Sequence, residues 1–542
     1  MVEKTLVEKP SPGPTQPTPA RRHSDLPKVG AVFWASLVLL AGFLLWASIS
    51  PASLGYLMTS SMEWITRSVG WSYLLVTLGC IGLMIYLGAS RYGSIRLGSN
   101  DDRPEFSTWA WLAMILSAVM GIGLISYGVA EPISHFMAPP HALEEPETMA
   151  AAVRALQFSF FDWGPHAWAV FGVFGLAIGY STHRKGRPGL VSPMLRPVLG
   201  KLVDGWFGKL VDVFAILATL FGTTTSLGLG AAQIEEGLNR VFGLPTGLSV
   251  QVIIIAIITV LFTLSALSGV NRGIKYISQI TMALSAGLAL FVLLMGPTSF
   301  IGNIFFRSIG QYVSDFFQVS LITPSTPDDL QWMQWWTYFM MAWWLSWGAF
   351  VGVFLAKISK GRTIRQFVAG VLGVPSLVFF AWFTIFGGTA IKFEMDGAPI
   401  AAQTAENLNS AFFAMLNELP LVQVTSVITM ILVALFFISG ADANTYVLSM
   451  MSSKGHLTPT RPVLTIWGVL TGVSAVLLLL VGGLAALQQA AMLSALPFTI
   501  IVALLGVSLT IELRRDPEFD VLRKSRFDLR KTVYGHKQNP EQ

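Results

Sequence analysis

The chain has 542 residues, of which 53% are hydrophobic and only 12% are charged, and its 35 Lys and Arg against 30 Asp and Glu give a net charge of +5. Water-soluble domains carry about twice that share of charged residues, so the composition excludes a string of soluble domains and indicates an integral membrane protein. The single cysteine, Cys80, excludes an intramolecular disulfide framework and any metal site built from several cysteines.

Long apolar runs recur along the chain. A helix needs about 20 apolar residues to cross the ~30 Å hydrocarbon core of a bilayer. Twelve runs meet this requirement, so we predict an all-α integral membrane protein with twelve transmembrane helices. The predicted spans are residues 29–49, 71–89, 108–130, 158–180, 209–232, 249–268, 276–296, 335–358, 367–391, 421–440, 463–483 and 491–511.

Positive charges are concentrated in alternate connections between these spans. The connections on one side carry 17 Lys and Arg, and those on the other side carry 5. Because cytoplasmic loops of membrane proteins hold the excess of positive charge, we expect both termini in the cytoplasm, with the chain in the cell (plasma or inner) membrane. This topology accounts for the net positive charge, so the sequence gives no reason to expect a nucleic-acid partner.

Three segments lie outside the predicted spans. Residues 1–28 are rich in Pro and Thr and are expected to form a disordered cytoplasmic tail. Residues 297–334 have mixed polarity and are expected to form an extracytoplasmic helix in the membrane plane. For the cytoplasmic tail, residues 512–542, two interpretations stay open: a short helix lying on anionic lipids, and a solvated tail.

Two spans contain glycine-rich stretches where we predict interruptions. In span 108–130 the stretch is residues 120–123 (Met-Gly-Ile-Gly), and in span 335–358 it is residues 343–352. Irregular backbone at membrane depth is tolerated only where it lines a cavity or is covered by protein, and broken segments in equivalent positions of two halves indicate the binding site of a secondary transporter. One such stretch alone would favour close helix packing instead.

Tryptophans at mid-membrane depth are the second indication of a site. Trp343, Trp344 and Trp347 lie about 13–20 Å into their span at 1.5 Å per residue, although tryptophans usually gather at the membrane surface. Their ring faces can bind a quaternary ammonium by cation–π attraction without a counter-charge. The alternative is that these large rings only pack helices together. Span 158–180 adds Trp163, Trp168 and Phe171.

Five sequence segments are distinctive enough to compare with known families. They are MGIGLISYGVAEPISHF (120–136), FDWGPHAWAVF (161–171), SGVNRGIKYIS (268–278), WWLSWGAFVGVFLAKISKGRTIRQF (343–367) and FFISGADANTYVLSMM (436–451). Together they resemble the betaine/carnitine/choline transporter (BCCT) family, and the similarity extends from about residue 29 to residue 511.

The resemblance implies a fold and a function. The fold is that of the leucine transporter: two peripheral helices (29–107) followed by two inverted five-helix repeats, helices 3–7 (108–296) and 8–12 (335–511), usually in a homotrimer. The function is secondary active import of a zwitterionic or quaternary-ammonium osmolyte, with glycine betaine favoured over ectoine, dimethylsulfoniopropionate or proline. It implies no enzymatic activity and no cofactor. The alternative is a proton-coupled or exchange carrier for choline or carnitine.

The resemblance also implies substrate-binding residues. The central aromatic box would be Trp343, Trp344 and Trp347, and backbone contacts would come from Met120, Gly121, Ile122 and Gly123. A second aromatic set would be Trp163, Trp168 and Phe171, with Phe354 on the cytoplasmic path. Choline carriers of the family tend to have Asp where this chain has Gly123, which favours a zwitterionic substrate, whereas Val119 replaces a family glycine and leaves the substrate open.

Coupling ions are the last implication. One sodium site would use Thr219, Thr223 and Phe350, and a second would use Ser117, Met120, Phe436, Ser439 and Gly440. At Gly440 the family has a hydroxyl residue, so the second site lacks one ligand. Hydroxyl side chains in membrane helices also commonly bond the carbonyl four residues earlier, so proton coupling stays open as the alternative to sodium.

Acidic and histidine side chains complete the set of candidates. Glu131 and Asp442 are the carboxylates near or inside the spans, and Asp442 is expected to follow a break in the tenth span and to make a structural hydrogen bond. The histidines show no metal-ligand spacing, so we expect no metal site beyond sodium. Because no phosphate-binding loop motif occurs, an ATP-driven pump is not expected.

Overall fold

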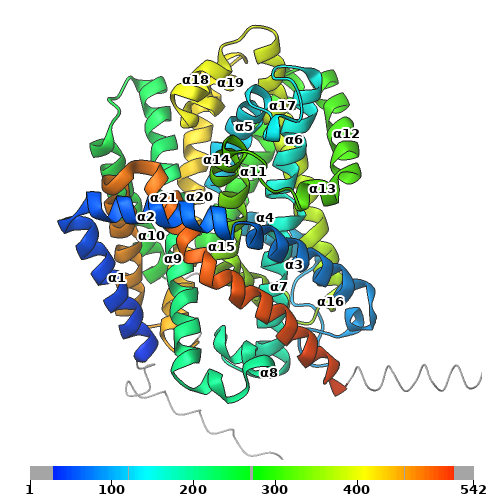
Figure 1. Cartoon of the computed structure of the whole chain (residues 1–542), viewed down its shortest axis with the longest axis vertical. Coiled ribbons are helices and arrows are strands. Elements are labelled where there is room, and N and C mark those ends of the chain that lie inside the picture. The colour runs from blue at the N-terminus through cyan, green and yellow to red at the C-terminus, as the bar shows by residue number, and fades with distance from the viewer. Residues whose placement is uncertain (1–28, 120, 269–272, 457, 518–542) are drawn as a thin grey trace, which may run out of the picture.

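The structure is a computed structural model that describes residues 29–119, 121–268, 273–456 and 458–517 (Figure 1). Within these residues the secondary structure is helical, apart from one isolated bridge between Arg96 and Thr363. The predicted all-α class is therefore confirmed. The prediction for the N-terminal tail lies outside the described residues, as do Met120 and the tail beyond residue 517.

The helices follow one another with short connections. They are α1 (Ala31–Ile49), α2 (Pro51–Ser68), α3 (Trp71–Ala89), α4 (Thr108–Val119), α5 (Ile122–Met137), α6 (Met149–Trp163), α7 (Pro165–Gly179), α8 (Arg196–Leu199), α9 (Trp206–Phe242), α10 (Leu248–Ser268), α11 (Gly273–Met295), α12 (Thr298–Ser314), α13 (Phe316–Ser320), α14 (Pro327–Trp335), α15 (Thr337–Ile358), α16 (Ile364–Val368), α17 (Val374–Met395), α18 (Ile400–Glu406), α19 (Ala411–Asn417), α20 (Val422–Ser452) and α21 (Arg461–Arg514). Short 3₁₀ or π turns are η2 (Arg91–Ser94), η3 (Pro140–Ala142), η4 (Tyr180–Arg184), η5 (Ser192–Leu195), η6 (Gly200–Asp204), η7 (Ala369–Gly373) and η8 (Leu408–Ser410).

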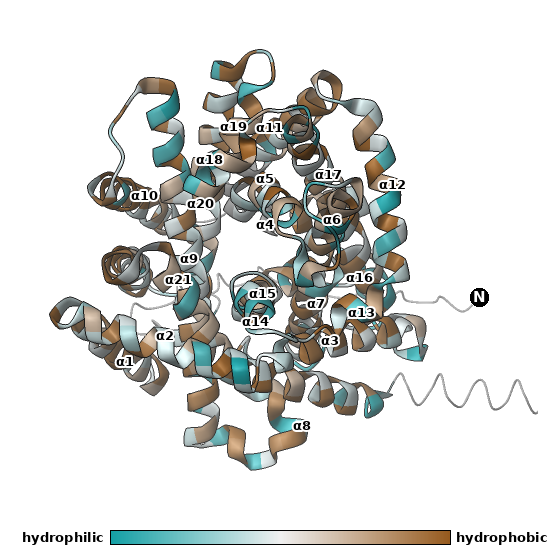
Figure 2. Cartoon of the chain, turned by 45° about the horizontal axis from the view of Figure 1, so that its top comes forward, coloured by the Kyte–Doolittle hydropathy of each residue, from teal (hydrophilic) through white to brown (hydrophobic). Residues whose placement is uncertain are grey.

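The helices are long and apolar enough for a membrane protein. Eight of those in the described residues could each cross a bilayer, or nine if the bent pair Gln279–Met295 and Thr298–Ser314 is counted as one span. On α10, the side chains of Ile253, Ile257, Val260 and Leu264 recur on one face and are exposed. A face of this kind requires lipid or protein cover, and Figure 2 shows such apolar residues on the outer helices.

The predicted spans and the observed helices differ in number because several spans are divided or joined. The third span is split into α4 and α5, and the fourth is split into α6 and α7 at Gly164. The eleventh and twelfth spans are joined in α21, which bends at Gly482 and Gly483. Gly483 has φ +64° and ψ −148°, a conformation that strongly favours glycine. Twelve crossings therefore stay a prediction.

The predicted interruption in the third span is confirmed. Helix α4 ends at Val119, Gly121 is extended with φ −130° and ψ −168°, and α5 begins at Ile122. The break brings the start of α5 to the middle of the helix bundle, beside α6 and α9.

The predicted interruption in the eighth span is wrong, because α15 runs without a break from Thr337 to Ile358. Its glycines serve close packing instead. A Cβ at Gly348 would lie 2.3 Å from Cε2 of Phe174, and a Cβ at Gly352 would lie 2.4 Å from Cβ of the same residue. The two glycines therefore let α15 approach α7 closely, which is the alternative that the sequence had left open.

The break expected in the tenth span is also absent, since α20 is one helix from Val422 to Ser452. A lone glycine in a helix costs about 1 kcal/mol relative to alanine, which is too little to interrupt a packed helix of 31 residues. Asp442 therefore lies within a helix and does not follow a loop.

Two helices lie across the direction of their neighbours. Helix α12 makes an angle of 109° with the described part of α11, Gln279–Met295, and the extracytoplasmic in-plane placement of residues 297–334 stays a prediction. Helix α2 was missed, because residues 50–70 are too polar for a span. Its buried residues Leu54, Met58, Met62 and Ile65 follow helical spacing and pack against α21 (Figure 1).

The start of the C-terminal tail makes polar contacts with the end of α7, and both interpretations of the tail as a whole stay predictions. Residue Asp516 is fully buried, where Arg184 Nε lies 2.6 Å and Tyr180 Oη 2.7 Å from its carboxylate. Arg187 pairs with Glu512 at 2.8 Å. Asp516 and Glu512 are therefore docked at the end of α7 through Arg184 and Arg187, whereas Arg514 and Arg515 are exposed. Residues 518–542 lie outside the described residues.

Candidate functional site

The three tryptophans predicted on the eighth span meet at the centre of the bundle, where α15 lies between α7 and α9 (Figure 2). Trp343 and Trp344 are stacked, with ring centroids 5.1 Å apart and planes 16° apart. Trp347 stands edge-on to both, at 5.9 Å from Trp343 and 6.5 Å from Trp344. Phe339 stacks on the other face of the group, 5.3 Å from Trp343.

Trp163 on α6 joins these rings and links them to α5. Its ring lies edge-on to Trp344 at 4.9 Å and to Trp343 at 6.3 Å. Its indole Nε1 donates a hydrogen bond of 2.7 Å to Oε2 of Glu131. The carboxylate thereby holds the orientation of this ring.

Backbone carbonyls orient two further rings. Trp343 Nε1 donates to the carbonyl of Gly222 at 3.1 Å, and Trp344 Nε1 donates to the carbonyl of Asp162 at 2.6 Å. The indole Nε1 of Trp347 is buried and has no partner among the described residues. Three of the four tryptophans are thus fixed, and the fourth retains a free hydrogen-bond donor.

The glycines at the break of the third span lie against these rings. A Cβ at Gly123 would lie 2.5 Å from Cη2 of Trp163 and 3.4 Å from Cη2 of Trp343. The absence of a side chain therefore lets the start of α5 touch both tryptophans. Gly121 caps α5 in an extended conformation, whereas Met120 and the side chain of Ile122 lie outside the described part.

The second predicted aromatic set is continuous with the first. Phe171 stands edge-on to Trp344 at 6.1 Å, and Trp168 stands edge-on to Phe171 at 5.8 Å. Phe379 on α17 contacts both Trp163, at 6.1 Å, and Trp168, at 5.7 Å. We call these connected rings the aromatic cluster: Trp163, Trp168, Phe171, Phe339, Trp343, Trp344, Trp347 and Phe379.

The sequence missed part of this cluster and placed one residue outside it. Phe339 and Phe379 carried no distinguishing spacing in the sequence. Nor did Tyr127, which lies beside the cluster with its ring 5.8 Å from Trp163. Phe354 is partly buried on α15, two helical turns or about 10 Å beyond Trp347. Among the described residues it makes no ring contact with the cluster, so its place on a cytoplasmic path stays a prediction.

The residues of the first predicted sodium site lie at the contact between α9 and α15. Thr219 and Thr223 are buried, and Thr223 Oγ1 donates to the carbonyl of Thr219 at 3.0 Å. Thr219 Oγ1 is buried without a partner among the described residues. Phe350 is buried on α15, 5.7 Å from Trp347. One hydroxyl therefore makes the ordinary helix bond, and one is free to bind a ligand.

The second predicted sodium site is described only in part. Ser439 Oγ donates to the carbonyl of Phe436 at 3.2 Å, and a Cβ at Gly440 would meet no atom within 4 Å. The side chain of Ser117 lies outside the described residues, as does Met120. Asp442 makes the expected structural bond, accepting 2.6 Å from Ser265 Oγ.

Beside the aromatic cluster, the structure brings together three ionisable groups that the sequence had kept apart. Glu131 and His135 on α5 and Asp162 on α6 are fully buried, and each offers a ligand atom, all within 4.8 Å of one another. The sequence could not show this grouping, because Asp162 comes from another helix. The expectation of no metal site beyond sodium stays a prediction. We call these three residues the acidic triad.

The comparison with known proteins identifies the family. The sequence profile of the betaine/carnitine/choline family transporters matches residues 31–518. The chain belongs to the betaine/carnitine/choline transporter family. Members of this family are transporters, so the prediction that the protein is not an enzyme is confirmed, as is the resemblance drawn from the sequence.

Relatives with named substrates cover almost the whole transporter. The glycine betaine transporter OpuD of Bacillus subtilis is 46% identical over 91% of this chain and 96% of its own length. The ectoine/hydroxyectoine transporter of Virgibacillus pantothenticus is 39% identical over 88% of this chain and 95% of its own. The betaine/ectoine transporter LcoP of Corynebacterium glutamicum is 36% identical over 90% of this chain and 78% of its own. These relatives support transport of a betaine-type osmolyte.

Proposed function

We propose that this transporter imports glycine betaine as a compatible solute by secondary active transport, and that the aromatic cluster binds its trimethylammonium head. The observation that carries the proposal is the meeting of Trp163, Trp343, Trp344 and Trp347 from two helices at the centre of the bundle. The ring faces, which carry negative quadrupole density, suit a methylated cation, which makes poor hydrogen bonds of its own. Ectoine, dimethylsulfoniopropionate and proline are the other candidate solutes.

Packing of the rings indicates how the substrate would enter. The centroids of Trp163 and Trp344 are 4.9 Å apart, so their rings touch. A trimethylammonium group must therefore separate rings to enter between them. Binding should then change the environment of several indoles at once, which makes tryptophan fluorescence a direct measurement of occupancy.

We further propose sodium as the coupling ion. The supporting observation is the pair Thr219 and Thr223 beside Phe350, where Thr219 Oγ1 is buried and has no partner among the described residues. Sodium is a hard cation that takes hydroxyl and carbonyl oxygens of membrane helices as ligands. The contact between α9 and α15 would then link ion binding to the helix that carries three of the tryptophans.

The remaining features of the proposal concern architecture. We propose twelve crossings in the cell membrane, with both termini in the cytoplasm, basic loops facing its anionic lipids, and a homotrimeric assembly. The two inverted five-helix repeats would comprise residues 108–296 and 335–511, as in the leucine-transporter fold. Since α5 is preceded by a break and α15 is continuous, the repeats differ at the position where symmetry would place equivalent breaks.

The test is uptake into proteoliposomes that contain the purified protein. Radiolabelled glycine betaine, choline, carnitine, ectoine, proline and dimethylsulfoniopropionate are each supplied with and without a sodium gradient. We expect sodium-dependent uptake of glycine betaine and exchange of labelled against unlabelled substrate. Uptake of choline alone, or no saturable uptake of any of these compounds, contradicts the proposal. Uptake driven equally well without sodium contradicts the choice of ion.

A further inference from the structure

The acidic triad has more negative charge than its surroundings can balance. Glu131, His135 and Asp162 have no exposed surface. Among the described residues no Lys or Arg forms an ion pair with either carboxylate, and the nearest ionisable partner is His135, whose Nε2 lies 3.9 Å from Oε1 of Glu131. Two uncompensated carboxylates this close in a medium of low dielectric constant cannot both stay ionised.

The hydrogen-bonding capacity of the triad is mostly unused. Oε1 of Glu131, both carboxylate oxygens of Asp162 and both ring nitrogens of His135 are buried and have no hydrogen-bond partner among the described residues. The ring of His135 is held between Trp332, at 4.9 Å, and Trp336, at 4.8 Å. These five polar atoms lie close together, are buried and have no hydrogen-bond partner, so they could bind a cation. The smallest such cation is a proton.

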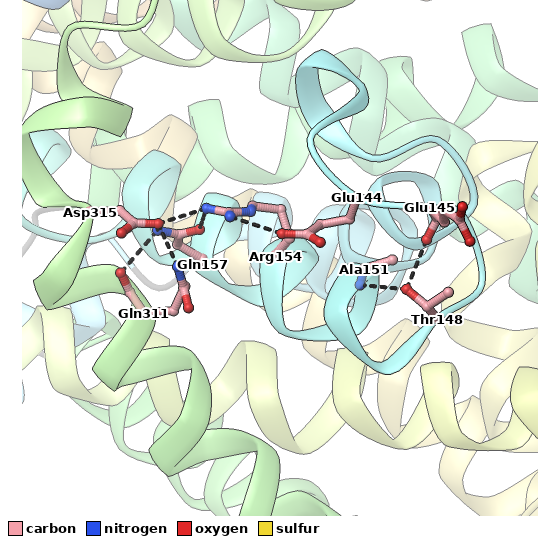
Figure 3. A network of polar contacts seen from close by, with 8 residues as sticks. All are labelled: Glu144, Glu145, Thr148, Ala151, Arg154, Gln157, Gln311 and Asp315. Atoms are coloured by element: carbon pink, nitrogen blue, oxygen red, sulfur yellow. Dashed lines mark hydrogen bonds and ion pairs between the residues drawn. The ribbon is translucent and has the colours of Figure 1, made fainter.

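Among the described residues, the basic groups of the neighbouring helices form no ion pair with the triad, and Arg307 on α12 is exposed. Arg154, on the same helix as Asp162, pairs with Glu144 at 2.9 Å and with Asp315 at 2.8 Å (Figure 3). On α17, Lys392 pairs with Asp396, and on α9, Arg240 pairs with Glu236 at 2.6 Å.

The other ionisable groups near the triad carry no positive charge that faces it. The groups on packed elements are Tyr127 on α5, Tyr312 on α12, His166 on α7, which contacts Ser320 at 2.9 Å, and His141 on η3, which faces Asp329 at 3.6 Å. The two tyrosines are neutral at physiological pH. They therefore supply no counter-charge, and a bound proton is the simplest counter-charge for the triad.

The triad is joined to the aromatic cluster by two bonds. Glu131 accepts the hydrogen bond of Trp163, and the backbone carbonyl of Asp162 accepts the hydrogen bond of Trp344. The carboxylate of Glu131 and the backbone of Asp162 therefore lie beside rings that would touch a bound quaternary ammonium. A positive charge among those rings favours the ionised form of a nearby carboxylate.

We propose that the acidic triad is a proton-binding site whose occupancy is coupled to substrate binding: it holds at least one proton on the Glu131–Asp162 pair in the free protein and releases it when a quaternary ammonium enters the aromatic cluster. The O–H bond of the carboxylic acid breaks, the electron pair stays on the carboxylate, and the proton passes to water, with the free ring nitrogen of His135 as the nearest acceptor on the way. This inference rests on the proposed function, because it needs a cationic substrate in the cluster.

Coupling of this kind has a fixed sign. Because binding expels a proton, the affinity for glycine betaine rises with pH over the range in which the triad is protonated, and glycine betaine in turn makes the triad more acidic. Release of one full proton changes the dissociation constant by about tenfold per pH unit. Partial release gives a proportionally smaller slope.

The experiment is calorimetric titration of the purified full-length protein with glycine betaine. Titrations at one pH use phosphate and Tris buffers, whose ionisation enthalpies differ, so the difference in observed heat gives the number of protons released. We expect a non-zero number for the wild type and a clear decrease in Glu131→Gln and Asp162→Asn. Glutamine can still accept the hydrogen bond of Trp163. The matched control is Asp442→Asn, a buried carboxylate on α20 that is bonded to Ser265, and it should release protons like the wild type.

Each outcome separates this inference from the proposed function. Saturable binding with the same heat in both buffers overturns the proton site and leaves the betaine site intact. Proton release that persists in both triad variants assigns the proton to another group and also overturns the inference. Metal analysis of the same preparation tests whether the triad binds a metal ion instead. One divalent ion per chain, with proton release that vanishes on chelation, would make the triad a metal site and overturn the inference. The wild-type measurement does not depend on any variant that fails to fold.

Discussion

The carboxylate of Glu131 and the indole of Trp163 are joined by a hydrogen bond of 2.7 Å between α5 and α6. Trp163 in turn contacts Trp344 and Trp343 on α15. One acidic side chain therefore orients a ring of the proposed substrate site from a helix that begins directly after a break in the chain. Movement of α5 would be transmitted to the rings through this bond.

Removal of one ring should weaken substrate binding without loss of the fold. We expect Trp347→Ala to raise the KM for glycine betaine by about tenfold or more, since a desolvated cation–π contact contributes about 2 kcal/mol. Trp347→Phe should retain most of the affinity. The matched control is Trp467→Phe, another buried tryptophan that is bonded to Ser452 outside the cluster, and its KM should not change. Equal loss in both positions would indicate a general effect on folding.

A side chain at Gly123 should displace Trp163. Because a Cβ there would lie 2.5 Å from Cη2 of Trp163, we expect Gly123→Ala to lower betaine affinity and to shift the tryptophan emission spectrum. Gly79→Ala on α3 is the control, since its Cβ would meet no atom within 4 Å. Gly123→Asp needs still more room, so we expect it to abolish uptake of betaine and not to admit choline. Uptake of choline by this variant would show that Trp163 can move aside.

The positions of some helices could be predicted from the sequence, whereas the roles of the glycines could not. The run 71–89 coincides with α3. An apolar run bounded by polar residues must form a helix in a membrane, because its backbone polar groups find no other hydrogen-bond partners there. The role of the glycines was ambiguous in the sequence. Those at 120–123 accompany a break, whereas Gly348 and Gly352 lie in an intact helix and leave room for Phe174 to pack against it. Which of the two occurs depends on the partner helix, and the partner is a property of the fold.

The acidic triad illustrates the same limit for function. Glu131 and His135 are four residues apart and share a face of α5, which a helical pattern can show. Asp162 reaches them only because α6 packs along α5 and ends at Gly164. Similarly, the tryptophan triplet was recognisable from its spacing, but its contacts with Trp163 and Phe379 were not.

The polar network at the N-terminal half of α6 should stabilise the fold above acidic pH. Burial alone would raise the pKa of Asp315, but hydrogen bonds from Gln311, Arg154 and Gln157 hold this pKa below its ordinary value (Figure 3). A lowered carboxyl pKa contributes stability above the unfolded pKa of about 3.9, and this stability is lost as pH falls through the folded value. We expect Asp315→Asn to lower the melting temperature at pH 7 and to have less effect near pH 3. A pH-independent decrease would contradict a charge-based contribution.

Loss of a hydroxyl at the first predicted sodium site should raise the sodium requirement. We expect Thr223→Ala to increase the sodium concentration for half-maximal uptake by about tenfold, which corresponds to about 1.4 kcal/mol of ion binding. Thr223→Ser keeps the hydroxyl and should behave like the wild type. Thr225→Ser on the same helix is a second control, because Thr225 bonds the carbonyls of Phe221 and Leu487 instead. An unchanged sodium dependence in Thr223→Ala would remove this residue from the site.

A hydroxyl added at Gly440 should strengthen the second predicted sodium site. The resemblance to the family implies a hydroxyl residue there, and in this chain a Cβ at Gly440 would meet no atom within 4 Å, which leaves room for a serine. We expect Gly440→Ser to lower the sodium concentration for half-maximal uptake by several-fold and to increase the number of sodium ions that accompany each betaine. Gly440→Ala is the control, because either replacement also stabilises the helix, by up to about 1 kcal/mol. Only the serine variant adds a hydroxyl oxygen. If alanine and serine change the sodium dependence equally, the oxygen is not a ligand and the second site does not lie at this turn of α20.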